Sequence, residues 1–329
     1  MLDRLPPELL LRILRHAAPL EYTPDKHVER RRVLRSLSLV NKRISEAAKP
    51  MLPEVMALCE ESGLLLLAAT DGARMRGSSV KLLVVRNDTY PAANLSFALL
   101  LCPNVVDLRI LRVYEVKMDH LPSRLQRLSV VQSHLHPPAK STFPCLLELS
   151  LAATRVSEEF LKQFPTPTTA PNLRALALNS VRIGFGEGIE VTGADLNQGT
   201  VAKLQALNLD AIGNSAPRPA FLTASPPAIR IYFSLPLDSD KLKNDFANKM
   251  DRLADKLVAS PSPLRLLVFP KPLQPLMHSS SAIRVAMTKV VQAAEAKDVE
   301  VVWEEQPDWL YEPLVSPFFW ERTKRIEQK

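Results

Sequence analysis

Five segments with the same pattern decide the fold: VVDLRIL (105–111), LQRLSVV (125–131), LLELSLA (146–152), LRALALN (173–179) and LQALNLD (204–210). Each has the form apolar-x-x-Leu-x-apolar, so that apolar residues alternate with others over five or six positions. Alternation with a period of two places successive side chains on opposite sides of an extended chain. We therefore predict a β-strand at each segment, with one apolar face and one exposed face.

The pattern continues on both sides of these segments. An earlier copy lies at 80–85, and weaker copies lie at 229–233, 264–269 and 299–303. The central leucines from Leu83 to Leu207 are 25, 20, 21, 27 and 31 residues apart. Strands that recur at intervals of about 20–30 residues are typical of a leucine-rich-repeat solenoid.

The longer connections between the strands have helical patterns. Residues 92–101 are apolar, and Ser157-Glu158-Glu159-Phe160 predicts a helix that opens with Ser157 as its cap and the two glutamates in its first turn. Apolar residues three or four positions apart predict helices over 239–259 and 283–294. Strands that alternate with helices imply an α/β fold, with a parallel sheet and the helices outside it.

The first fifty-five residues have a different pattern. Pro6 and Pro7 suit the start of a helix, and the apolar residues from Leu9 to Leu14 form an arc about 200° wide. We expect a second helix to cover part of this arc with one apolar face, formed by Val33, Leu37, Val40, Ile44 and Ala47. Two short helices cannot bury so much apolar surface by themselves, and the segment therefore needs a partner.

Two blocks of this segment read Leu5-Pro6-x-Glu8-Leu9-Leu10-x-x-Ile13-Leu14 and Leu37-x-Leu39-Val40-x-Lys42-Arg43. Their order resembles the F-box, a helical module that docks on the Skp adaptor of cullin-type ubiquitin ligases. The resemblance implies an adaptor surface formed or supported by Leu5, Pro6, Leu9, Ile13, Leu14, Leu37, Val40 and Ile44. Two features depart from the family pattern: Ile44 replaces the usual Trp, and the connection at 16–32 is about a dozen residues longer, which we interpret as a solvated loop.

The repeats resemble the irregular leucine-rich repeats that follow F-boxes in many fungal and animal proteins. The resemblance implies a non-catalytic substrate receptor, which binds a Skp-type adaptor through its F-box and, through that adaptor, a cullin scaffold. The repeats would then bind an unknown protein substrate. A repeat-based interaction protein outside a ubiquitin ligase, with its first helices on some other helical partner, is the alternative.

Charge and composition exclude several classes of protein function. Residues 1–50 contain eleven Lys or Arg and six Asp or Glu, and thus supply +5 of the net charge of +7. Because a nucleic-acid binder concentrates basic residues on its working surface, the balanced repeats argue against nucleic acid. The longest apolar run, 64–69, is too short to span a membrane. Cys59, Cys102 and Cys145 suit reduced thiols, which predicts a cytoplasmic or nuclear protein.

Motifs for catalysis, metals or cofactors are weak. His134-x-His136 lies in a Pro-rich stretch with no cysteine or acid at ligand spacing, and we interpret it as a surface loop. The glycines between Gly184 and Gly188 lack the Lys-Ser/Thr of a phosphate loop and predict a turn. We expect no catalytic residues, no metal site and no cofactor.

In each repeat strand, the residues that flank the central leucine point away from the apolar side. This places a set of mainly polar side chains on one surface, which is the candidate substrate site: Arg109, Arg127, Glu148, Ser150, Asn179, Asn208, Asp210, Arg230 and Tyr232. Small residues lie among them and leave the middle of the surface shallow: Ala152, Ala175, Ala177 and Ala206. The alternative is a solvated sheet face with no binding role.

Three regions are expected: the F-box-like segment at 1–55, the repeats at 56–305 and an aromatic tail at 306–329. Six of the nineteen aromatic residues, including all three Trp, fall between Trp303 and Trp320. Solenoids expose an apolar end that must be covered, and we therefore interpret this region as a terminal cap. The alternative is a tail that crosses the surface of the repeats, where its aromatics would anchor a partner.

Overall fold

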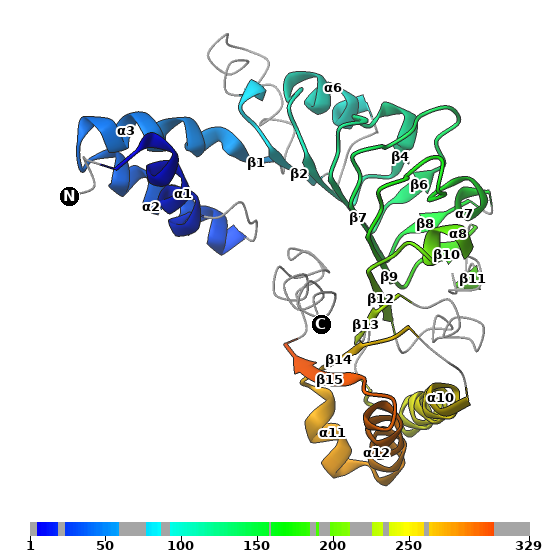
Figure 1. Cartoon of the computed structure of the whole chain (residues 1–329). Helices are drawn as coiled ribbons and strands as arrows, with labels where there is room; N and C mark the ends of the chain where they lie inside the picture. The colour runs from blue at the N-terminus through cyan, green and yellow to red at the C-terminus, as the bar shows by residue number, and fades with distance from the viewer. Residues whose placement is uncertain are drawn as a thin grey trace.

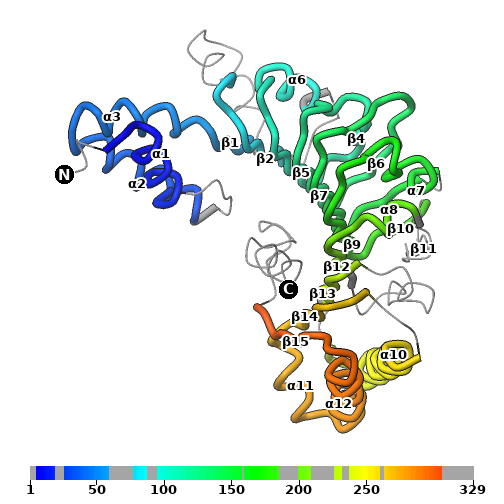
Figure 2. Tube along the Cα trace, in the orientation of Figure 1, coloured from blue at the N-terminus to red at the C-terminus, as the bar shows by residue number. Residues whose placement is uncertain are grey.

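The computed structural model describes residues 5–18, 24–58, 77–86, 93–157, 159–184, 189–190, 198–210, 226–232, 237–259 and 263–305. Over these residues the chain is an α/β protein, with a long, mainly parallel sheet, helices around it and no closed barrel (Figure 1). The α/β class predicted from the sequence is confirmed at this level. The trace in Figure 2 places the first helices at one end of the long sheet and the last helices at the other.

The large sheet has ten strands, which are neighbours in chain order and run parallel throughout. They are β1 (Val55–Leu58), β2 (Leu82–Arg86), β3 (Asp107–Leu111), β5 (Arg127–Val131), β7 (Glu148–Ala152), β9 (Ala175–Asn179), β12 (Ala206–Asp210), β13 (Ala228–Tyr232), β14 (Leu266–Pro270) and β15 (Glu300–Glu304). The register sets Leu108 beside Leu128 and Leu128 beside Leu149. All nine strands predicted from the repeats are confirmed, and β1 is an addition.

A second sheet, which the sequence did not predict, lies behind the first part of the large one. Its order is β11-β10-β8-β6-β4, parallel except between β10 and β11. The strands are β4 (Glu115–Lys117), β6 (His134–His136), β8 (Arg155–Val156), β10 (Arg182–Ile183) and β11 (Ile189–Glu190). The prediction of a loop at His134–His136 is therefore wrong.

One recurring turn joins the two sheets. The residue directly after β3, β5, β7 and β9 has a positive φ of 47–57° each time, at Arg112, Gln132, Ala153 and Ser180. Successive turns are tied together, since the Arg112 N–H donates to the Val131 carbonyl and the Gln132 N–H to the Ala152 carbonyl. Left-handed backbone at non-glycine residues is uncommon, and its recurrence shows that these repeats share one local geometry.

Helices form the other connections: α6 (Ala93–Leu101), α7 (Phe160–Gln163), α8 (Gln198–Val201), α10 (Asp240–Ala259), α11 (Leu273–Ser279) and α12 (Ser281–Glu295), with the 3₁₀ helix η3 (Met118–His120). The helices predicted at 92–101, 239–259 and 283–294 are confirmed. The predicted cap at Ser157 is wrong, because Glu159 is the N-cap of α7 and makes no side-chain hydrogen bond there.

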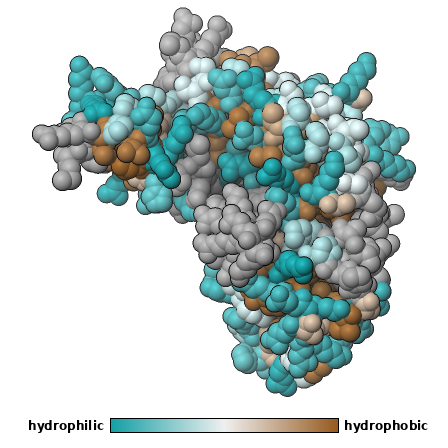
Figure 3. Space-filling view, in the orientation of Figure 1, coloured by the Kyte–Doolittle hydropathy of each residue, from teal (hydrophilic) through white to brown (hydrophobic). Residues whose placement is uncertain are grey.

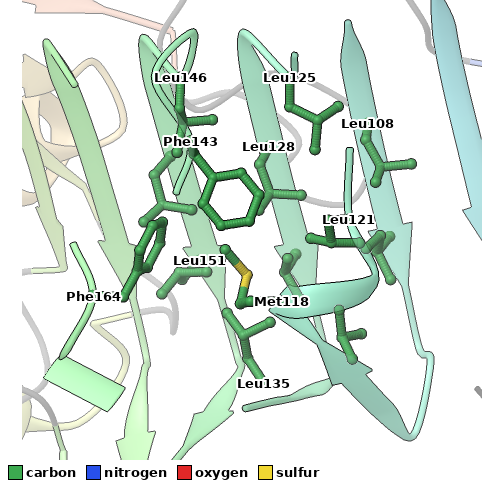
Figure 4. Packing of buried hydrophobic residues seen from close by; sticks show 14 of the residues in the cluster. Leu108, Met118, Leu121, Leu125, Leu128, Leu135, Phe143, Leu146, Leu151 and Phe164 are labelled. Carbon is green, nitrogen blue, oxygen red and sulfur yellow. The ribbon is translucent and has the colours of Figure 1, made fainter. Parts of the chain in front are cut away.

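Two separate apolar cores lie on one side of the large sheet. The first contains buried residues between Leu58 and Leu207, and Figure 4 shows Met118 and Phe143 packed against the leucines of its strands. The second contains buried residues between Ile229 and Val299, largely from β13, β14, α10 and α12. We call the opposite side of the large sheet, which carries Arg109 and Arg230, the front face.

The described residues of 5–18 and 24–54 form a helical head of α1 (Pro7–Ala17), α2 (Pro24–Ser38), α3 (Lys42–Ala48) and the 3₁₀ helix η2 (Lys49–Glu54). The interpretation of 16–32 as a solvated loop is wrong from Pro24 onward, because α2 begins there. The single helix predicted across Val33–Ala47 is also divided. It ends at Ser38, and the Asn41 side chain accepts a hydrogen bond from the Ile44 N–H at 2.9 Å and starts α3.

Candidate functional site

The helical head has a small core of its own. The buried apolar residues are Leu10, Leu14, Ala18, Leu34, Ile44, Ala48 and Met51. Leu10 and Leu14 are four residues apart, so that they form one face of α1 and bury it against the rest of the head. The opposite face of α1 remains available to another molecule.

The predicted adaptor residues divide between this core and the surface. Pro6 is exposed, and Leu9 and Ile13 are each 46 % exposed. These three lie three and four residues apart, which places them on one stripe of α1. Val40 is 60 % exposed in the turn between α2 and α3. Apolar side chains are thus gathered on the surface of the head, where Figure 3 shows a hydrophobic patch.

The other four predicted residues are less accessible. Leu14 and Ile44 are only 2 % and 1 % exposed, so they support the surface from inside and do not form part of it. Leu5 and Leu37 are half-buried. The sequence prediction omitted three exposed apolar residues of the head: Leu11, Val28 and Leu39. The wide apolar arc of α1 was a usable signal for Leu11.

A buried ion pair inside the head is connected to the large sheet through Lys81. The Arg30 guanidinium lies 3.2 Å from the Glu54 carboxylate, and both side chains are almost fully buried. Glu54 also lies 3.2 Å from the Lys81 ammonium group, directly before β2. Burial lowers the pKa of Arg30, and the Glu54 carboxylate opposes that shift. Because removing one member of a buried pair leaves an uncompensated charge, this contact holds α2, η2 and the sheet together.

At one end of the front face, two arginines surround Asp107. The Arg127 Nε lies 3.1 Å from one carboxylate oxygen of Asp107, and the Arg109 Nε lies 3.8 Å from the other. Asp107 and Arg109 are buried, whereas the Arg127 side chain is 39 % exposed. The sequence prediction omitted Asp107. Its position in β3 is equivalent to that of Arg127 in β5, and this equivalence could have identified it as a member of the same face.

A second polar cluster lies on β13 and β15. The Arg230 guanidinium lies 3.4 Å from the Glu304 carboxylate and donates a hydrogen bond of 2.9 Å to the Glu305 carbonyl. Arg230 is 4 % exposed. Its role in the structure is therefore to hold the end of β15, and it is not presented to a partner.

The remaining candidate substrate residues do not form one open surface. Asn179, Asn208 and Ser150 are buried, and Glu148 is half-buried beside Arg127. The side chains of Asp210 and Tyr232 lie outside the described residues. The predicted alanines are also buried, within apolar patches of the front face. The expectation of a continuous exposed polar surface is therefore wrong, and only Arg127 and Glu148 of this set remain partly accessible.

The histidines of β6 lie beside a small pocket. The His134 and His136 rings are 4.5 Å apart, and the His136 Nε2 lies 3.9 Å from the Glu115 carboxylate. Burial, with the charge of His136, lowers the pKa of His134. The adjoining pocket has a volume of about 250 Å³ and is lined in part by Tyr114 and Arg155. Among the described residues, no three His, Cys, Asp or Glu side chains are grouped so that they could hold a metal ion.

Burial raises the pKa of the Cys102 thiol to about 11, and Cys102 is therefore a protonated, unreactive core residue.

Cys59, most of the Gly184–Gly188 turn and the tail at 306–329 lie outside the described residues. The cap interpretation of that tail and its alternative therefore both remain predictions. Trp303 is described: it belongs to β15, and its ring lies 5.6 Å from that of Phe269.

A scan against protein-family models finds no match for this chain, and a search of curated proteins finds none either. No helix within the described ranges has the length and apolar character needed to cross a membrane.

Proposed function

We propose that this chain is an F-box protein with a leucine-rich-repeat-like solenoid, and that it acts as the substrate receptor of a Skp–cullin ubiquitin ligase. In this proposal the head binds the Skp-type adaptor and the repeats bind the protein to be modified. The chain supplies no catalytic residue, because other subunits carry out ubiquitin transfer.

The observation that carries the proposal is the apolar stripe of α1. Pro6, Leu9 and Ile13 belong to the block Leu5-Pro6-x-Glu8-Leu9-Leu10-x-x-Ile13-Leu14, and they stay exposed although the head buries other leucines nearby. Exposed apolar residues that cluster on one element mark a site of protein interaction. A short motif in the expected order therefore coincides with an apolar surface that the described part of the chain leaves exposed.

The connection between head and sheet also suits a receptor. The Arg30–Glu54–Lys81 contacts join α2 to the beginning of the large sheet and leave no long linker between them. A protein bound by the repeats would thus be held in a fixed direction from the adaptor. Within the front face, Arg127 and Glu148 are the accessible charged residues of the predicted set, and Glu300 on β15 is exposed on the same face, so such a protein would be recognised from these positions.

The head is tested by the double variant Leu9→Lys with Ile13→Lys. We expect the adaptor to be lost from affinity-purified material, because two charges would be placed in an apolar contact. The melting temperature should stay unchanged, since both side chains lie outside the head core. Mass spectrometry of the co-purified proteins identifies what the wild type retains and the variant loses.

The matched control is Val258→Lys with Val285→Lys, on α10 and α12. These valines are 60 % and 52 % exposed, and the control adds the same charge far from α1 in the sequence. It should retain the adaptor. Retention by the Leu9/Ile13 variant would refute the proposal, and loss of a different helical partner would favour an interaction protein outside a ubiquitin ligase.

A further inference from the structure

Helix α2 has two unlike faces. One face is buried in the head and carries Arg30, Val33, Leu34 and Leu37. On the opposite face, residues at spacings of three or four follow one another from Val28 through Arg31, Arg32 and Arg35 to Leu39 in the turn after the helix. Val28 is 67 % and Leu39 is 85 % exposed, and the three arginines are exposed as well.

This second face is hollowed into a groove. A cavity of about 350 Å³ opens among its side chains, lined by Val28, Arg31, Arg32, Arg35 and Leu39 together with His27 and Ser36. Apolar side chains stand at the two ends of the groove, and guanidinium groups stand between them. A helix that rises 1.5 Å per residue separates these ends by about 16 Å, which is the length of three helical turns.

The charge of the groove is uncompensated within the described residues. No acidic side chain there pairs with Arg31, Arg32 or Arg35, whereas the neighbouring Arg30 is paired with Glu54. The environment of His27 reports the same positive field, since burial and then the charges of Arg31 and Arg30 lower its pKa. Most of the net charge of the chain also lies in the head. An acidic partner would relieve this repulsion and approach rapidly by electrostatic steering.

We propose that this groove on α2 docks an acidic protein segment of about three helical turns, with carboxylates opposite the arginines and an apolar side chain at each end. Charge complementarity requires an anionic occupant, and Val28 and Leu39 distinguish a peptide from a nucleic acid. The phosphate backbone binds basic residues without needing apolar contacts at both ends of a groove. The groove is separate from the α1 stripe of Pro6, Leu9 and Ile13 that carries the adaptor proposal, and the two surfaces approach one another only where Leu39 adjoins Val40.

The probe is a synthetic helical peptide with leucine at both ends of one face and glutamate between them, and its binding to the full chain is followed by fluorescence anisotropy. A second peptide has glutamine in place of each glutamate, and a third probe is a short DNA duplex. We expect the glutamate peptide to bind at least tenfold more tightly than the glutamine peptide, with an affinity that falls as salt rises.

Two variants separate the charged and apolar contributions. Both Arg31→Glu with Arg35→Glu and Val28→Ser with Leu39→Ser should weaken binding of the glutamate peptide at least tenfold. Their helical content and melting temperature should be unchanged, because all four side chains are exposed. The control Arg252→Glu with Arg284→Glu, at exposed positions of α10 and α12, makes the same change in net charge and should bind like the wild type.

The proposal fails if the glutamate peptide does not bind, or if the glutamine peptide binds equally well. It also fails if the Val28/Leu39 variant binds the glutamate peptide normally. It fails too if the DNA duplex binds as tightly as the glutamate peptide and only the arginine variant weakens DNA binding. That last result would identify a general polyanion surface. The Leu9→Lys, Ile13→Lys variant should bind the peptide normally, so that failure of this proposal is distinguishable from failure of the adaptor function.

Discussion

The two halves of the large sheet differ in what covers their apolar side. In the first half, Leu108, Leu128 and Leu149 are 20 and 21 residues apart, and the chain returns through the short strands of the second sheet. In the second half, 38 residues separate Ile229 from Leu267, and the chain returns through α10, which has 20 residues. The strands are alike, and the connections between them are not.

This difference shows that connection length decides which layer forms. A helix of 20 residues is about 30 Å long and can cover several strands, whereas the connections 112–126 and 132–147 are too short for such a helix and add a short strand beside the previous one. Each half accordingly builds its own core, one lined by the second sheet and the other by α10 and α12. We therefore expect the two halves to respond separately to damage.

The largest expected effect comes from the second core. Phe246 on α10 is 1 % exposed, and Phe246→Ala should lower the free energy of unfolding by about 3–5 kcal/mol, because it removes buried area and leaves a cavity. Hydrogen exchange should accelerate over 237–305 and change much less over 93–184. The matched variant is Phe160→Ala in the first core, where the ring is fully buried.

Phe160→Ala should give the opposite distribution, with faster exchange over 93–184 and little change over 237–305. Equal acceleration of both regions by either variant would show that the ten-stranded sheet unfolds as one unit, in spite of its two cores.

The long strands could be predicted because their signal is local. The alternation in segments such as 125–131 spans enough residues to be recognised, and the parallel register sets equivalent leucines side by side. The strands of the second sheet have two or three residues each, too few for a period. Strand β6 exists because β4 and β8 pair with it, which is a tertiary effect that His134-Leu135-His136 does not carry by itself.

Buried charge explains the errors in the head and on the front face. In α2, Arg30 occupies an inward position and interrupts the apolar pattern, and the sequence therefore predicted a loop. In the structure Glu54 neutralises the buried arginine. On the front face, Arg109 and Arg230 looked like solvent-facing residues. Both are buried against an acid. Arg230 is paired with Glu304, which is distant in the sequence, and Arg109 lies beside Asp107 on its own strand. The exposed Leu9 and Ile13 could be predicted, because the arc of α1 exceeds what the head buries.

A smaller effect tests the helix starts of the two halves. In the second half, the Ser280 side chain accepts a hydrogen bond from the Ile283 N–H and caps α12. Ser280→Ala should therefore lower the free energy of unfolding by about 1 kcal/mol. In the first half, the Ser157 hydroxyl is buried and makes no hydrogen bond with the described residues. Ser157→Ala should be neutral or slightly stabilising, since no hydrogen bond is lost. Urea unfolding measures both, and equal losses would contradict the assignment of the cap to Ser280 alone.

The smallest expected effect is a pH dependence confined to the first half. The Asp119 carboxylate accepts hydrogen bonds from the N–H groups of Ala139, Lys140 and Ser141 at 2.9–3.3 Å. These bonds, above all that from Ala139, lower its pKa from 3.8 to about 2. Because the folded state binds this proton less readily than the unfolded state, the stabilisation is present above about pH 4 and is lost as the pH falls toward 2.

The variant Asp119→Asn should lose this contribution at neutral pH and show a shallower decrease in melting temperature between pH 5 and pH 2. The change should be modest, because the carboxylate is exposed to solvent. Hydrogen exchange should locate it at residues 139–141, which Asp119 holds, and α10 and α12 should be unaffected. Asp255→Asn, at an exposed position of α10, is the control and should follow the wild-type curve. If Asp119→Asn instead accelerates exchange in α12, the two cores are coupled through the sheet, and the separation between the halves is smaller than their packing indicates.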